Sequence, residues 1–278
     1  MPNCRRPKLR GIATHALLAL ILALAAAAAR AQQPGEGMPV DLELVIAVDV
    51  SRSMDDEEFR LQRNGYVEAI RHPDFVRAVT SGTYGRIALT YVEWSGRLYQ
   101  KVVVPWRLID GADAAEKFAD ALQQQPPVIG RGTSISAAIV FGAGLLDARG
   151  DDAARRVIDI SGDGPNNYGP AVAQARDLAV AKGIVINGLP ILIRPSPLVP
   201  DIVRYYSDCV IGGPGSFVLP VRKVEEFEEA IRRKLVLEVA GQPRTDIIAV
   251  RADAPSDCLA GEKARQHLAD PYYPGLDN

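Results

Sequence analysis

Hydrophobic residues along this chain fall into short continuous runs separated by amphipathic segments. The run LELVIAVD at residues 42–49 is too continuous for a half-exposed strand, and it predicts a strand buried on both faces. Other runs of strand length occur at residues 86–93, 98–105, 157–161 and 184–192, the last preceded by Gly183, and a final strand is expected from 209–211 together with 216–221.

Charged or alanine-rich segments between these runs predict helices. They cover residues 55–70, 112–124, 134–148, 170–182 and 223–239. Strands that alternate with helices indicate a mainly parallel sheet with helices on both faces, which is a doubly wound α/β fold. Only a short Ser95-Gly96 connection separates the strands at 86–93 and 98–105, so these two are expected to form an antiparallel hairpin at an edge of the sheet.

The composition is that of one globular domain. The 278 residues are 47% hydrophobic and 24% charged, which argues against a disordered chain, collagen or a coiled coil. We expect a single domain over residues 40–240 and a polar, proline-rich tail over 241–278. The formal charge is −2, without the basic surplus of a nucleic-acid-binding protein.

Residues 1–31 have the three parts of a secretory signal peptide. A basic stretch is followed by an apolar run over 11–29 and by Ala29-Arg30-Ala31, a small-x-small cleavage pattern. The alternative is an uncleaved membrane anchor, although the run is diluted by alanine and by Thr14 and His15. The prediction is an exported, periplasmic or secreted protein with no membrane span after leader removal. The leader holds five basic residues and no acidic one, so its loss would make the formal charge five units more negative.

Export changes how the cysteines are interpreted. Cys4 would leave with the leader, so the mature chain would hold Cys209 and Cys258. Two thiols in an oxidising compartment favour a disulfide, which would tether the tail to the domain. Two unpaired, buried cysteines are the alternative.

Oxygen-bearing side chains gather in three loops that the predicted topology brings together. The first strand runs into DVSRS at residues 49–53, GRGTS spans 130–134, and SGDGPN spans 161–166. In a doubly wound sheet, ligands bind beyond the carboxyl ends of the strands. Carboxylates and hydroxyls without clustered cysteine or histidine suit a hard cation.

These residues resemble the metal-ion-dependent adhesion site (MIDAS) of the von Willebrand factor A (vWA) domain. That family's pattern of Asp-x-Ser-x-Ser, a distant threonine and a distant aspartate maps to Asp49, Ser51, Ser53, Thr133 and Asp163. The resemblance spans about 200 residues and includes the order of elements and the edge hairpin. The segments DVSRSM, DISGDGPNN and DCVIGGPG are similar to an uncharacterised bacterial subfamily of secreted vWA-like proteins.

The resemblance implies a binding module that holds a divalent cation, with Mg²⁺ expected and Mn²⁺ or Ca²⁺ as alternatives. A shell rich in neutral hydroxyls leaves the cation electrophilic, so that an Asp or Glu of a protein partner completes its coordination. The third loop departs from the family, because Gly162 stands where a hydroxyl residue is more common. Asp159, in the same predicted strand, is the alternative to Asp163.

Two other functions stay open at this point. One is a metal-dependent hydrolase of the envelope, although the sequence offers no catalytic constellation, since His72 and His267 are isolated and no Walker A or Gly-x-Ser-x-Gly motif occurs. The other is a structural envelope protein with a vestigial metal site. The leading interpretation is a binding protein rather than an enzyme.

Overall fold

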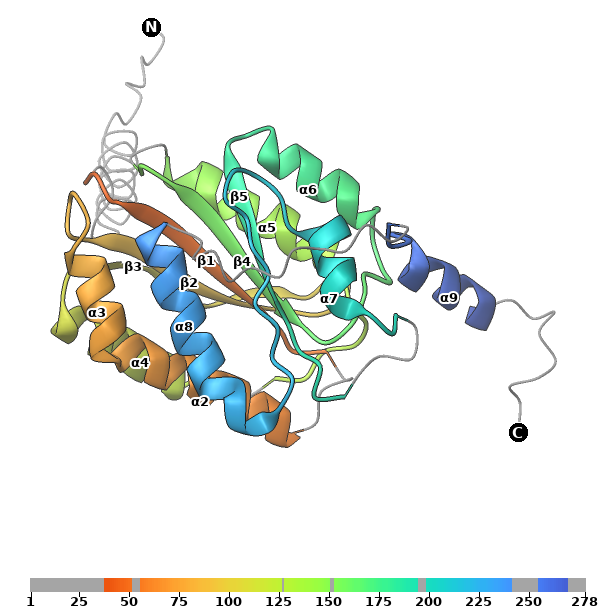
Figure 1. Ribbon diagram of the computed structural model, residues 1–278, viewed down its shortest axis with the longest axis horizontal. Helices are drawn as coiled ribbons and strands as arrows, with labels where there is room; N and C mark the ends of the chain where they lie inside the picture. The colour runs from red at the N-terminus through yellow and green to blue at the C-terminus, as the bar shows by residue number, and fades with distance from the viewer. Residues whose placement is uncertain are drawn as a thin grey trace, which may run out of the picture. The chain divides into compact units, whose positions relative to one another are not determined.

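A five-stranded sheet forms the centre of the structure, a computed structural model that describes residues 38–51, 56–126, 128–150, 153–194, 199–241 and 255–269. All of these lie in one compact unit, Gly37–Asn278. The strands lie in the order β3-β2-β1-β4-β5 (Figure 1). Their bounds are β1 Leu42–Asp49, β2 Ile87–Trp94, β3 Gln100–Ile109, β4 Arg156–Gly162 and β5 Ile184–Pro190.

The pairing of the strands confirms the predicted doubly wound α/β fold. β1 lies in the middle and pairs in parallel with β2 and β4, and β4 pairs in parallel with β5. β2 and β3 form the antiparallel hairpin at one edge. β3 continues through Pro105 to Ile109, beyond the predicted end, because an edge strand tolerates a proline that donates no hydrogen bond to a neighbour.

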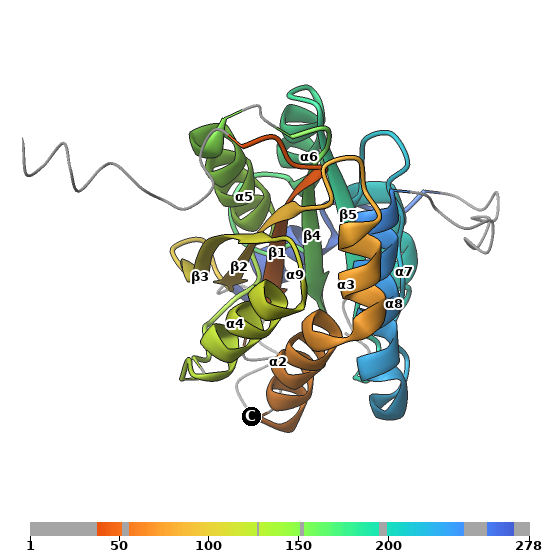
Figure 2. The same ribbon diagram turned by 90° about the vertical axis from the view of Figure 1, so that its left-hand side faces the viewer.

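Helices cover both faces of the sheet (Figure 2). The bounds are α2 Asp56–Arg71, α3 Pro73–Thr80, α4 Ala112–Gln123, α5 Ile135–Arg149, α6 Val172–Val180, α7 Ile202–Tyr205, α8 Phe227–Ala240 and α9 Ala260–Ala269. Two short helical turns complete the described elements, the π-helix η1 at Tyr206–Val210 and the 3-10 helix η2 at Val224–Glu226.

Alternate residues of β1 enter two separate hydrophobic clusters. Leu44 and Ile46 pack with residues of α2, α3, α4 and α8 on one face. Val45 and Ala47 pack with residues of α5, α6, α7 and η1 on the other. Successive side chains of a strand point to opposite faces, so a strand buried on both needs an unbroken apolar run. This burial explains the pattern of residues 42–49.

Four parts of the chain differ from the sequence-based expectation. Residues 209–221 do not form a strand: the chain enters η1 and then touches β5 through isolated bridges at Gly212 and Val218. Pro214 and Pro220 lack the backbone donors that a regular ladder needs. The helices α3, α7 and α9 were not predicted. The helix α3 begins at Pro73, after His72, whose ring accepts a hydrogen bond from the Asp74 amide as an N-cap.

The predicted leader, residues 1–31, lies outside the described residues, as does Ser53 of the predicted metal site. No helix in the described part of the chain combines the length and the apolar character that crossing a membrane requires.

Candidate metal site

The first loop of the candidate site leaves the carboxyl end of β1. Asp49, the last residue of β1, is fully buried, and its Oδ1 accepts a hydrogen bond of 2.7 Å from the Ser51 amide. Its Oδ2 accepts no hydrogen bond from the residues that the structure describes. A buried carboxylate oxygen without a donor is costly in free energy. Asp49 is therefore held in place through one oxygen, while the other has no hydrogen-bond donor in the part of the chain that the structure describes.

The third loop approaches Asp49 closely at the end of β4. A Cβ placed on Gly162 would lie 3.0 Å from Asp49 Oδ2 and 2.9 Å from the Tyr206 hydroxyl. Only glycine fits this contact without displacing a neighbour. The departure from the family pattern at residue 162 thus has a packing reason, since β4 passes directly against the Asp49 carboxylate.

Asp163 follows Gly162 and interacts electrostatically with Asp49. Asp163 is 6% exposed. Burial raises the pKa of Asp49 well above its ordinary value, and the nearby Asp163 carboxylate raises it further, whereas hydrogen bonding from Ser51 lowers it. Two close acidic groups of this kind are stabilised by a positive charge between them.

The second loop brings Thr133 to the same end of the sheet. Gly130 forms a parallel bridge with Ser51, and the Gly130 amide donates to the Val50 carbonyl at 2.7 Å. Thr133 is 5% exposed. Its amide donates to Asn167 Oδ1, and its carbonyl accepts from the Asn167 amide, each at 2.9 Å. Asn167 therefore fixes the backbone of Thr133 relative to the loop that carries Asp163.

Two asparagines that were not expected at the site connect these loops. Asn166, fully buried, accepts from the Ser136 amide at 3.0 Å, and its Nδ2 donates to Glu262 Oε1 at 2.7 Å. With Asn167 it joins the loop after β4 to the start of α5. The only signal in the sequence is their position in the loop that follows Asp163, since short polar side chains in loops can bond to nearby backbone.

Asp159, the alternative to Asp163, lies in a different environment. Its Oδ1 is 2.7 Å from Lys234 Nζ, in an ion pair buried between β4 and α8. Lys234 also pairs with Glu238 at 2.5 Å. Asp159 thus belongs to a buried charge cluster with these two residues.

Tyr206 adds a hydroxyl to the surroundings of the acidic pair. Its side chain is fully buried, and its hydroxyl has no hydrogen-bond partner among the described residues. Burial raises the pKa of Tyr206 most, and the carboxylates of Asp49 and Asp163 raise it further. The neighbouring Tyr205 hydroxyl accepts from the Asn166 amide at 3.1 Å.

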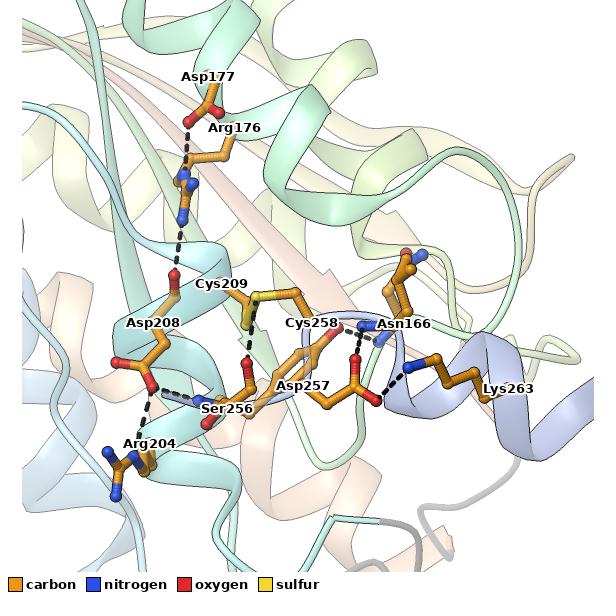
Figure 3. Close-up of a disulfide and its surroundings, with 12 residues drawn as sticks. Asn166, Arg176, Asp177, Arg204, Asp208, Cys209, Ser256, Asp257, Cys258 and Lys263 are labelled. Atoms are coloured by element: carbon orange, nitrogen blue, oxygen red, sulfur yellow. Dashed lines mark hydrogen bonds and ion pairs between the residues drawn. A yellow bond between two sulfur atoms is a disulfide. The ribbon is translucent and has the colours of Figure 1, made fainter. Parts of the chain in front are cut away.

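The predicted disulfide is present (Figure 3). Cys209 of η1 and Cys258 are bonded, with an S–S distance of 1.97 Å and a Cα–Cα distance of 5.4 Å. The Ser256 amide donates to Asp208 at 2.8 Å beside the bridge. The disulfide thus tethers the chain just before α9, and Glu262 of α9 contacts Asn166 in the loop after β4.

The donor set consists of carboxylate and hydroxyl oxygens. The described residues hold no group of three or more His, Cys, Asp or Glu side chains that would form a conventional metal cluster. The four described candidates, Asp49, Ser51, Thr133 and Asp163, come from adjacent loops at one end of the sheet. Their chemistry suits a hard cation such as Mg²⁺.

Comparison with known proteins gives the fold and a family. A family profile described as a protein of unknown function (DUF1194) matches residues 39–243. No curated protein matches the chain in sequence.

Similar solved structures carry vWA domains. The mussel byssus proximal thread matrix protein 1, in a structure described as having a zinc-occupied MIDAS motif, is 18% identical with a TM-score of 0.54, over 74% of this chain and 49% of that one. The pilus adhesin SpaC of Lactobacillus rhamnosus GG is 14% identical with a TM-score of 0.55, over 75% and 31%. A von Willebrand factor type A protein from Catenulispora acidiphila is 15% identical with a TM-score of 0.52, over 72% and 43%. The chain thus spans half or less of these relatives, and the likeness establishes a vWA-like fold.

Proposed function

The chain belongs to the DUF1194 family of unknown function, and we propose that its vWA-like domain is an exported binding module that engages a protein partner through a divalent cation. The module is taken to span residues 40–240, with 241–278 as a tethered tail. The cation is expected to be Mg²⁺, with Mn²⁺ or Ca²⁺ as alternatives.

One observation carries this proposal: the buried acidic pair at the ends of β1 and β4. Asp49 Oδ2 accepts no hydrogen bond from the described residues, and the Asp163 carboxylate acts on the same group. Such an arrangement is unfavourable by itself. A cation between the two carboxylates would compensate for both the missing donor and the mutual repulsion.

The residues that would hold the cation are Asp49, Ser51, Thr133 and Asp163, together with Ser53. When bound, the cation would act as a Lewis acid with an open coordination position. Asn167 would keep Thr133 in place, and Gly162 would allow β4 to come close enough for Asp163 to take part. A partner's Asp or Glu carboxylate would then complete the coordination, which makes binding dependent on the metal.

The comparisons support a binding role at the level of the fold. One similar structure is described as a pilus adhesin, and another as holding zinc in a MIDAS motif. Both lie far below the identity at which a function carries over, so the partner and the metal of this chain are inferred from its own residues. The disulfide supports export, because such bonds persist in oxidising compartments.

The test is capture of a partner from envelope extract on the immobilised full chain. We expect a protein to be retained in Mg²⁺, to be released by EDTA, and to be absent from the Asp49→Ala variant. Asp147→Asn is the matched control, because Asp147 is an α5 carboxylate that pairs with Lys182 and Arg156 rather than with the loops. Retention that is equal in EDTA, or in Asp49→Ala, would overturn the proposal.

A further inference from the structure

A groove of about 790 Å³ lies beside the candidate metal site. One wall is the turn between β2 and β3, residues 95–99, and another is Gly130-Arg131. Residues 168–170 and Arg265 of α9 complete it. Because Gly130 also bridges to Ser51, the groove begins directly next to the loop that follows β1.

Three arginines line this groove, and none of its described lining residues is acidic. Arg97, Arg131 and Arg265 are all exposed. None of the three forms an ion pair with a described carboxylate, whereas Arg63 pairs with Glu93 and Arg71 with Asp120. A concentration of unpaired guanidinium groups in a chain of formal charge −2 is a local positive site on an acidic protein.

Aromatic and apolar side chains lie between the arginines. The Arg265 guanidinium lies 4.4 Å from the centroid of the Tyr168 ring, and Gly132 is close enough that a Cβ there would lie 2.6 Å from that ring. Leu98, in the turn between β2 and β3 that also lines the groove, is 89% exposed. The fully buried Ser95 has a hydroxyl without a hydrogen-bond partner among the described residues. The groove thus combines fixed cationic groups, an apolar contact and an unsatisfied hydroxyl.

We propose that this arginine groove, defined by Arg97, Arg131 and Arg265, binds an acidic segment of the protein partner. The proposal rests on the proposed function, because the same segment would place one carboxylate on the cation and further carboxylates on the guanidinium groups. Guanidinium groups bind carboxylates through two parallel hydrogen bonds. Leu98 and Tyr168 provide surface for the apolar side chains of a peptide, which a simple polyanion lacks.

The disulfide determines part of this groove. Arg265 belongs to α9, which follows Cys258, and the bond to Cys209 joins this segment to η1 (Figure 3). The contact between Glu262 and Asn166 places α9 against the loop that bears Tyr168. One of the three arginines is therefore supplied by the disulfide-tethered tail.

The experiment measures binding of a short fluorescein-labelled peptide of alternating glutamate and leucine to the full chain by fluorescence anisotropy. In Mg²⁺ we expect the variant Arg97→Gln/Arg131→Gln/Arg265→Gln to bind the peptide at least about tenfold more weakly, since each charge-assisted contact contributes severalfold. Arg107→Gln is the matched control. Arg107 is an exposed residue of β3 that pairs with Leu89 of β2, and it lies far along the strand from the groove. It should bind as the wild type does.

Calorimetric binding of Mg²⁺ separates this proposal from the metal-site proposal. The triple arginine variant should bind Mg²⁺ as the wild type does, and in EDTA the wild type should keep a weaker, salt-sensitive affinity for the peptide that the triple variant lacks. If Mg²⁺ does not bind but arginine-dependent peptide binding remains, the metal proposal fails and the groove stands. Equal peptide binding by wild type and triple variant would overturn the groove proposal. So would equal binding of a glutamine-leucine peptide, or tighter binding of a sulfated polysaccharide or an anionic phospholipid vesicle.

Discussion

Replacement of Lys234 by methionine tests the role assigned to Asp159. Lys234 is 1% exposed, and its Nζ lies 2.7 Å from Asp159 Oδ1 and 2.5 Å from Glu238 Oε1. Asn187 donates to the other oxygen of Glu238 at 2.6 Å. In Lys234→Met, two buried carboxylates would stay without their cation.

The expected loss of folding stability in Lys234→Met is large and depends on pH. Removing one partner from a buried ion pair costs about 3–5 kcal/mol. Burial raises the pKa of Asp159 to about 7, against the attraction of Lys234 and with a further rise from Glu238. Without Lys234 the pKa of Asp159 rises more. The folded protein then binds more protons than the unfolded chain above about pH 4, so its stability falls as pH rises through that window.

The assay is urea unfolding at about pH 5 and about pH 8. Near pH 8, Lys234→Met should lower the free energy of unfolding by the full amount of about 3–5 kcal/mol. Near pH 5 the decrease should be smaller, because a buried carboxyl group then keeps its proton. Adding Asp159→Asn and Glu238→Gln should recover much of the loss. Lys182→Met is the control, because Lys182 is an exposed partner of Asp147 and should cost about 1 kcal/mol or less. If Lys234→Met lost no more free energy of unfolding than Lys182→Met, and the same amount at both pH values, Lys234 would not stabilise the buried carboxylates.

Two further substitutions test the loop packing and the disulfide. Gly162→Ala should cost about 1–3 kcal/mol in urea unfolding and weaken Mg²⁺ binding, because its Cβ would press on Asp49. Gly164→Ala, with no atom within 4 Å of its Cβ, is the control, and equal effects of the two would contradict this packing account. Cys258→Ser should cost about 4 kcal/mol without reductant, from the sequence separation of 49 residues to Cys209. Reductant should destabilise the wild type and leave the stability of Cys258→Ser unchanged. If reductant did not change the stability of the wild type, the disulfide would not contribute to it.

Most of the sheet was predictable because β1, β2, β4 and β5 are buried on both faces. Continuous apolar runs such as residues 42–49 have few alternatives in a chain of this composition. Residues 209–221 resemble a strand in sequence but do not form one, because their apolar residues are buried in η1 and in irregular chain instead. The polar composition of the tail concealed α9, whose position depends on a disulfide and on Asn166 rather than on an apolar face.

The residues of the candidate site were proposed from the sequence, but their surroundings could not be. Asp49 ends a predicted strand, Asp163 closely follows one, and Thr133 directly precedes a predicted helix. Asp159 could not be assigned from sequence, since its partner Lys234 lies 75 residues away on another element. The need for glycine at residue 162 could not be seen in the sequence either, because the side chains of Asp49 and Tyr206 that leave no room there are distant along the chain.

Titration of the full chain with Mg²⁺ by isothermal calorimetry tests the central claim most directly. Beside the wild type we would measure Thr133→Val, which removes one hydroxyl and keeps the shape of the side chain, and Asp159→Asn, which alters a carboxylate outside the proposed shell. We expect the wild type and Asp159→Asn to bind one Mg²⁺ ion each, and Thr133→Val to bind it much more weakly or not at all. Absence of binding to the wild type at millimolar Mg²⁺, or equal binding by Thr133→Val, would contradict the claim.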